Sequence, residues 1–248
     1  MTLPAAGGLP EGPPVRTRIG LIAPFDLALD DELARWIPDG VSLHAARTPR
    51  LPGPVDLDLA ERLNDHDQIL ACIGELSAIE PAAYAYACTA ASFVDGVTGE
   101  HALAEAIRLA GGVPAVTTSG ALLAALTALE VRSVAVAAPY EIMITERLVR
   151  FLAEAAITVT GYGSLGITSR IWEVPYRTTA ELIRRLPGSG AEAVLLPCTN
   201  LSSYDLIAPL EAELGVPVIS ANQATVWAAL RLVGRRAVGP GQALVERA

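Results

Sequence analysis

Short apolar runs alternate with longer amphipathic stretches along the chain, and the order of these segments recurs in its two halves. An apolar run over 18–23 leads into the motif Ala-Pro-Phe-Asp at 23–26. Another over 133–138 leads into Ala-Pro-Tyr-Glu at 138–141. Short apolar runs bounded by turn residues are typical of buried strands. Because the same order of strands, helices and loops then follows each run, with landmarks roughly 110–115 residues apart, the sequence predicts an internal duplication.

A cysteine followed by a threonine closes a buried strand in each half. The first pair is Cys88-Thr89, after the run 83–87, and the second is Cys198-Thr199, after the run 194–197. Ligands of open parallel sheets bind outside the carboxyl ends of the strands. Two facing lobes would therefore bring both thiols to opposite sides of one cleft. Such a pair can serve as nucleophile, acid or base on the two faces of one small substrate.

Helical spacing of apolar residues predicts helices over 58–79, 145–156 and 205–214. Helices that alternate with parallel strands indicate an α/β fold of two pseudo-symmetric, doubly wound parallel-sheet lobes with the site between them. The predicted organisation is a disordered leader over 1–16, a first lobe over 17–127 and 231–248, and a second lobe over 128–230. The exchange of segments between the two lobes is left open.

Polar residues in the loops after the strands are candidates for binding a small acid. Thr89, Thr199 and Asn200 offer neutral donors to a carboxylate. Tyr140 carries a hydroxyl where the first half has Phe25, which favours a specific donor. We also expect each cysteine near the first turn of a helix, where the helix dipole would lower the pKa of the thiol. The candidates are Cys88 and Cys198 as catalytic residues and Pro24, Thr89, Ala90, Ser119, Tyr140, Thr199 and Asn200 as substrate-binding residues.

Composition narrows the classes of function. A net charge of −9 and a pI near 4.9 argue against nucleic acid or an anionic membrane surface as a partner. No uninterrupted apolar run is long enough to predict a membrane span. Three cysteines do not make a disulfide framework and fit a reducing cytoplasm, with Cys72 expected in the core. No His/Cys cluster has the spacing of metal ligands, so neither a metal nor another cofactor is expected.

Several stretches resemble a known family: Tyr86–Phe93, Ala138–Tyr140, Ser164–Ile167, Cys198–Leu201 and Ile207–Glu211. Together they are similar to the aspartate/glutamate racemase superfamily, and within it to the branch of maleate cis–trans isomerases and arylmalonate decarboxylases. The resemblance covers about residues 18–234. It implies a cofactor-independent enzyme in which isomerase-like members have a cysteine at both the Cys88 and Cys198 positions. Decarboxylase-like members have a glycine at the first position.

Both thiols being present predicts an isomerase or racemase of a small carboxylic or dicarboxylic acid, similar to maleate isomerase. One alternative is an arylmalonate-type decarboxylase with Cys198 as proton donor, and another is a protein that binds small acids without turnover. The partner expected is a small carboxylate, and the oligomeric state stays open, a homo-oligomer included. Maleate isomerases carry an Asn in the loop after the first strand, where this chain has Phe25-Asp26-Leu27, which predicts a different acid as substrate.

Overall fold

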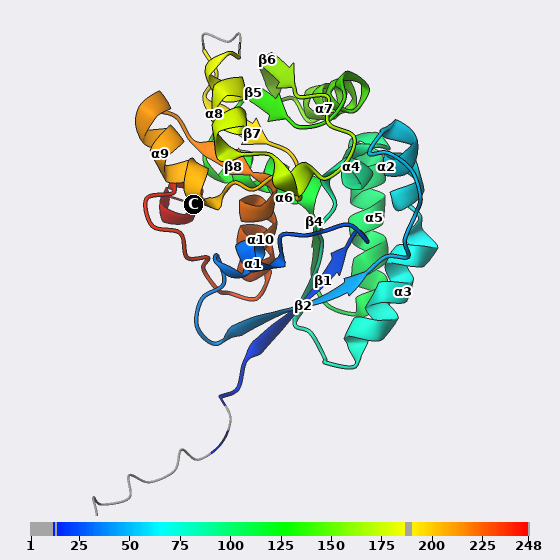
Figure 1. The fold of residues 1–248 in the computed structure, drawn as a ribbon. Helices are drawn as coiled ribbons and strands as arrows, with labels where there is room; N and C mark the ends of the chain where they lie inside the picture. Colours follow the sequence, from blue (N-terminus) through cyan, green and yellow to red (C-terminus); the bar gives the residue numbers. More distant parts are fainter. Residues whose placement is uncertain (1–11, 13, 187–189, 248) are drawn as a thin grey trace, which may run out of the picture.

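Two four-stranded parallel sheets form the centre of the computed structural model, which describes residues 12, 14–186 and 190–247 (Figure 1). The first sheet contains β1 (Thr17–Ala23), β2 (Val41–Arg47), β3 (Ala83–Tyr86) and β4 (Ala115–Thr117). The second contains β5 (Ser133–Ala138), β6 (Thr158–Ser164), β7 (Ala193–Leu196) and β8 (Val218–Ser220). Their orders, β2-β1-β3-β4 and β6-β5-β7-β8, correspond strand by strand. The predicted α/β fold of two parallel lobes is confirmed.

Helices flank both sheets (Figure 1). Those from the first half are α1 (Asp30–Ala34), α2 (Leu57–Leu63), α3 (His66–Ser77), α4 (Thr89–Phe93), α5 (Gly96–Gly111) and α6 (Thr118–Ala128). Those from the second half are α7 (Ile142–Glu154), the 3-10 turn η1 (Ile171–Glu173), α8 (Tyr176–Arg184), α9 (Tyr204–Leu214), α10 (Ala221–Leu232) and α11 (Ala243–Arg247). None of the helices in the described ranges is both long and apolar enough to cross a membrane. Most of the leader predicted over 1–16 lies outside the described residues.

The central strands β3 and β7 are buried throughout because helices cover both faces of a parallel sheet. All four residues of β3 and all four of β7 are buried, which explains why their sequences lack the polar alternation of a half-exposed strand. The two halves also end corresponding helices in the same way. Gly112 follows α5 and Gly215 follows α9, each in the left-handed conformation with φ of 66° and 73°. Glycine adopts this conformation without a steric penalty, so the turn into the next strand forms at low cost.

The helix predicted over 58–79 is two helices, and that prediction was wrong. Helix α2 ends at Leu63, and α3 begins at His66. Between them the carboxylate of Asp65 accepts hydrogen bonds from the backbone N–H groups of Asp67 and Gln68, at 2.9 and 3.3 Å. This N-cap starts a new helix, and the apolar spacing alone hid it. The helices predicted over 145–156 and 205–214 are confirmed as α7 and α9.

The last long helix of the second half covers the first lobe. Helix α10 follows β8 of the second sheet, but it packs on α6 and against β3 and β4 of the first sheet. The chain beyond α10 also touches both lobes. The buried Gln242 Oε1 accepts hydrogen bonds from Trp36 Nε1 at 2.7 Å and from Gln223 Nε2 at 2.9 Å, and the N–H of Ala243 donates to Glu211 of α9.

A buried carboxylate holds the lobes in register. Glu32, on α1 of the first lobe, accepts hydrogen bonds from the backbone N–H and the hydroxyl of Ser203, at 2.9 and 3.0 Å, and from Asn222 Nδ2 at 3.1 Å. Ser203 is the N-cap residue of α9, so Glu32 lies at the positive end of that helix. Buried polar groups cost free energy when unpaired, and this cluster satisfies three donors at once.

We predict that Glu32→Ala lowers the free energy of unfolding by about 3 kcal/mol, because three buried donors lose their acceptor. Urea denaturation followed by circular dichroism measures the change. The matched control is Glu75→Ala, at an exposed position of α3, which should change stability by less than about 0.5 kcal/mol. Equal effects of the two substitutions would contradict this role for Glu32.

Candidate active site

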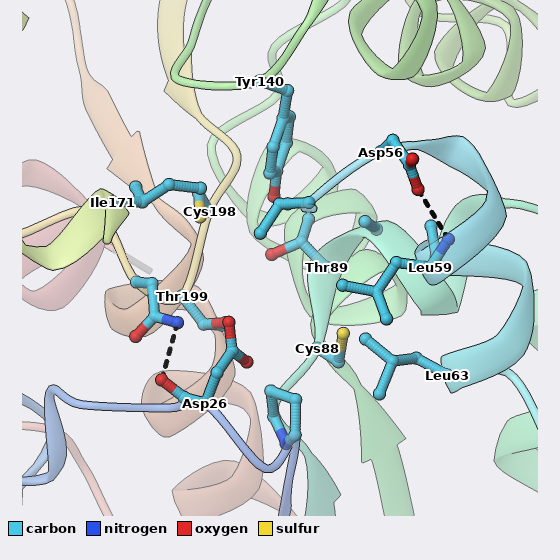
Figure 2. A pocket seen from close by; sticks show the side chains of 15 residues that line it. Asp26, Asp56, Leu59, Leu63, Cys88, Thr89, Tyr140, Ile171, Cys198 and Thr199 are labelled. Carbon is cyan, nitrogen blue, oxygen red and sulfur yellow. Dashed lines mark hydrogen bonds between the residues drawn. The ribbon is translucent and has the colours of Figure 1, made fainter. Parts of the chain in front are cut away.

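A small cavity, with a volume of about 40 Å³, lies between the lobes at the carboxyl ends of the four central strands (Figure 2). Pro24 and Asp26 follow β1, Cys88 follows β3, Tyr140 follows β5 and Cys198 follows β7. The remaining lining residues are Val55, Asp56, Leu59, Ala60, Leu63, Thr89, Ala90, Ile171, Thr199 and Asn200. All of the predicted site residues except Ser119 thus meet in one place.

The two thiols enter this cavity from different lobes. Cys88 is 6% exposed and Cys198 is 5% exposed, and both are free cysteines. Figure 2 shows their sulfurs on different sides of the space, with Thr89 and the Tyr140 hydroxyl between them. They are close enough for a charge on Cys198 to raise the pKa of Cys88. Both thiols therefore line the same cavity.

Both thiols are neutral at pH 7. Burial raises the pKa of Cys88 to about 12, opposed by the backbone N–H of Ala91 and reinforced by the charge of Asp26. Burial likewise raises the pKa of Cys198 to about 12, opposed by the Tyr140 hydroxyl and the backbone N–H of Asn200. The expectation that helix N-termini lower these pKa values was wrong, because loss of hydration outweighs the local N–H groups.

The expected helix start is found at Cys88, which is the N-cap residue of α4, but not at Cys198. Helix α4, after Cys88, has only five residues, and the chain after Cys198 forms a turn before α9 begins at Tyr204. Neither thiol therefore lies at the start of a long helix. The helix macrodipole is correspondingly small beside Cys88 and is displaced by several residues from Cys198.

A tyrosine hydroxyl lies beside each thiol, and both hydroxyls donate to backbone carbonyls. Tyr140 donates to the carbonyl of Pro197, next to Cys198. Tyr86 donates to the carbonyl of Leu63 at 2.8 Å, and its hydroxyl also favours the ionised form of Cys88. Burial raises the pKa of both phenols well above the ordinary value. The charge of the neighbouring cysteine is the second largest cause and raises the pKa further. They are therefore neutral donors, and Tyr86 is a neighbour of the site that the sequence reasoning did not select.

Thr89 has the one hydroxyl in the cavity that is both buried and without a hydrogen-bond partner among the described residues. It lies near enough to Tyr140 to favour the ionised form of that phenol, but Thr89 Oγ1 makes no hydrogen bond to any residue in the described ranges. Buried polar atoms are almost always paired, so an unpaired one that faces a cavity indicates a group supplied by a ligand. Thr89 is well placed to donate to a carboxylate.

Asn200 lines the cavity, but its amide joins the lobes. Its Nδ2 donates to the backbone carbonyl of Asp26 at 3.0 Å, and its Oδ1 accepts from the N–H of Ala28 at 2.9 Å. Ser119 lies outside the cavity. Its buried hydroxyl contacts Ser92 Oγ at 2.7 Å and donates to the carbonyl of Thr89 at 3.1 Å. Both residues therefore position the loops around the thiols.

The comparison with known proteins identifies the family. The family model described as arylmalonate decarboxylase matches residues 63–245 of this chain. The chain belongs to the arylmalonate decarboxylase family. It is 41% identical over 150 residues to arylmalonate decarboxylase from Bordetella bronchiseptica, in an alignment that covers 59% of this chain and 62% of that protein. The chain thus spans less than two thirds of the length of that relative.

Members named as isomerases are similar as well. The chain is 32% identical over 181 residues to maleate isomerase from Geobacillus stearothermophilus, covering 68% of this chain and 70% of that protein. Its fold matches a cysteine-to-serine mutant of Nocardia farcinica maleate cis–trans isomerase with a TM-score of 0.83 and 25% identity, covering 94% and 100% of the two chains. That structure holds a covalently bound succinylcysteine intermediate. The predicted enzyme family, with both isomerases and decarboxylases in it, is confirmed.

Several residues that line the cavity were not predicted from the sequence. Val55, Leu59 and Leu63 form an apolar wall from α2 and the loop before it, and Ile171 reaches the cavity from the second lobe. The N–H of Val55 donates to the carbonyl of Thr168 at 2.7 Å, which ties this wall to the second lobe. Such contacts between distant loops leave no local signature in the chain.

Asp26 is the most consequential of the residues that the sequence reasoning missed. Burial raises the pKa of its carboxyl, opposed by its own backbone N–H and by the Asn200 amide. The described residues around the cavity include Asp26 and Asp56 but no Lys, Arg or His. The sequence offered one signal, since Asp26 directly follows the loop that contains Pro24.

We predict that alkylation of Cys88 and Cys198 by iodoacetamide accelerates about tenfold per pH unit and reaches no plateau below pH 10, because only the thiolate reacts. Peptide mass spectrometry measures the rates at each site. The same chain unfolded in urea is the control, where the thiols regain an ordinary pKa of 9.0 and the rate levels off above it. A plateau near pH 8 in the folded protein would show that the thiols are not stabilised in the neutral form.

Proposed function

We propose that this chain is a cofactor-independent isomerase or racemase of a small carboxylic acid that uses Cys88 and Cys198 on opposite faces of the substrate. One observation carries the proposal: thiols from opposite lobes open into the same small cavity. The cavity lies at the carboxyl ends of the central strands, where parallel α/β sheets bind ligands. Three free cysteines fit a reducing compartment, and we place the enzyme in the cytoplasm.

A neutral thiol can isomerise an unsaturated acid without a further reactant. Sulfur bonds to one alkene carbon, the π bond breaks, and its electrons move toward the neighbouring carbon and carboxylate. A proton then reaches that carbon, supplied from the opposite face by the second thiol and replaced by the proton of the first. The resulting single bond rotates, and reversal of the addition releases the trans isomer. The succinylcysteine held by the N. farcinica isomerase supports this type of intermediate.

Neutral donors stabilise the charge that develops in this step. The free hydroxyl of Thr89 is available to a substrate carboxylate, and the backbone N–H groups of Ala91 and Asn200 support the two sulfurs when they ionise. Fixed donors at the position of developing charge lower the barrier most in a site that excludes water. The described cavity lining contains no cationic side chain, so neutral donors alone would stabilise the developing negative charge.

A second candidate is decarboxylation of a malonate-type acid, with Cys198 donating a proton to the enediolate that remains. The 41% identity to the B. bronchiseptica decarboxylase favours it, and so does the apolar wall formed by Val55, Leu59 and Leu63. The presence of Cys88 as well as Cys198 in the lining favours the first candidate, because that reaction uses two thiols. The two candidates differ in their need for Cys88.

We predict that Cys88→Gly lowers kcat for cis–trans isomerisation of small unsaturated acids by at least about 10³-fold, since one of two acid–base groups is lost. Proton NMR in D2O measures isomerisation, exchange at carbon and decarboxylation of phenylmalonate in one experiment. The control Cys72→Ala changes a buried cysteine of α3 outside the cavity and should keep kcat within about twofold.

Retained turnover of phenylmalonate by the Cys88→Gly variant would instead establish the decarboxylase. If the wild-type protein neither exchanges deuterium into any acid of a broad panel nor converts it, the chain binds acids without turnover.

We predict that Thr89→Val raises KM for the preferred acid about tenfold, because the substrate carboxylate loses a donor. The melting temperature should stay unchanged, since this hydroxyl makes no hydrogen bond within the described protein. Thr179→Val is a matched control: Thr179 Oγ1 is also buried without a described partner, but it lies on α8 outside the cavity. A similar rise in KM for both variants would refute carboxylate binding by Thr89.

A further inference from the structure

Asp26 presents a carboxylate to the cavity from the loop after β1. Its backbone is fixed from the second lobe, because Asn200 Nδ2 donates to its carbonyl at 3.0 Å and Asn200 Oδ1 accepts from Ala28. With the main chain held in this way, the side chain lines the cavity that also contains both thiols (Figure 2). The position of the Asp26 backbone is therefore set by the contact between the lobes.

The Asp26 carboxylate is stabilised by no ion pair in the described part of the chain, and the described lining contains no cation. Its field reaches both thiols, because Asp26 raises the pKa of Cys88 and of Cys198. A substrate that touches both sulfurs must therefore lie within the same field.

Asp56 differs in this respect, although it also lines the cavity. Its Oδ1 accepts a hydrogen bond from the N–H of Leu59 at 2.9 Å and caps α2, as the dashed line in Figure 2 shows. Donors at the start of a helix stabilise a carboxylate charge. Asp26 caps none of the described helices, so its carboxylate lines the cavity without the support of a helix N-terminus.

Two carboxylates that share a site disfavour each other when both are charged, whereas a carboxylate and a neutral N–H or O–H donor attract. Thr89 supplies a donor for one substrate carboxylate, but a second carboxylate would face Asp26. We propose that Asp26 makes this cavity selective for acids that carry one carboxylate and a hydrogen-bond donor, such as a carboxamide or hydroxyl group, over dicarboxylates. The selectivity rests on the proposed function, whose reactive thiols define where the substrate lies.

The test compares succinate with its monoamide, which have nearly the same shape but differ by one charge and one donor. Neither has a double bond, so their binding is independent of turnover. Isothermal titration calorimetry at pH 7 should show that the wild-type protein binds the monoamide at least about tenfold more tightly than succinate. Asp26→Asn, an isosteric change that keeps the loop, should reduce this preference by at least about tenfold, because the repulsive charge is gone.

Asp56→Asn is the matched control, since it removes the same charge from the cavity lining while asparagine still caps the helix. It should change the preference by less than about threefold. Equal affinities in the wild-type protein, tighter binding of succinate, no binding of the monoamide, or an Asp26→Asn variant that keeps the preference would each overturn the proposal.

Turnover of maleate and its monoamide separates this inference from the proposed function. The wild-type protein should isomerise the monoamide with a kcat/KM at least about tenfold above that for maleate, and Asp26→Asn should reverse the order. Selective binding of succinate monoamide without turnover of either unsaturated acid would support the selectivity and refute the isomerase. Efficient turnover of maleate by the wild-type protein would support the isomerase and overturn the selectivity.

Discussion

Two groups from separate lobes can act on one molecule only if both sheets present the carboxyl ends of their central strands to the same space. This constraint orders the molecule. Glu32 satisfies Ser203 and Asn222 across the lobe contact, and Asn200 holds the loop that contains Asp26. Both are polar contacts, so the relative position of the lobes is fixed by hydrogen-bond geometry as well as by apolar packing. The spacing of the thiols depends on these contacts.

The cavity combines low hydration with little fixed positive charge, and each property explains part of the chemistry. Burial keeps Cys88 and Cys198 neutral, so either can provide a proton as well as a sulfur nucleophile. Neutral donors such as the Thr89 hydroxyl hold a carboxylate without neutralising it. Charge in the substrate therefore matters more here than in a site lined by arginine, because nothing cationic in the described lining offsets the carboxylate of Asp26.

The sequence predicted those features that depend on the order of elements along the chain. The repeated apolar runs predicted the matching sheets, and the two Cys-Thr pairs identified the strands whose loops meet, with Pro24, Thr89 and Tyr140 beside them. Features that depend on three-dimensional surroundings were missed. The cap at Asp65 split a predicted helix, and the pKa of both thiols was expected to move in the wrong direction.

The missed residues have a common physical reason. Ile171 and Val55 reach the cavity through contacts between loops that are far apart in the chain, and Asp26 gains its importance because the described cavity lining contains no cation. Ser119 was selected because it follows a strand, but its hydroxyl is used by Ser92 and Thr89. Position along a strand thus indicates where a loop lies, while the direction of each side chain depends on its neighbours.

The placement of α10 has a consequence for how the molecule folds. This helix belongs to the second repeat by sequence, yet it shields β3 and β4 of the first sheet. A polypeptide cut between the repeats would leave the apolar surface of β3 and β4 open to solvent, and would leave α10 without its packing partner. Despite two separate sheets, neither repeat contains a complete hydrophobic core, so the pair must acquire native structure as one cooperative unit.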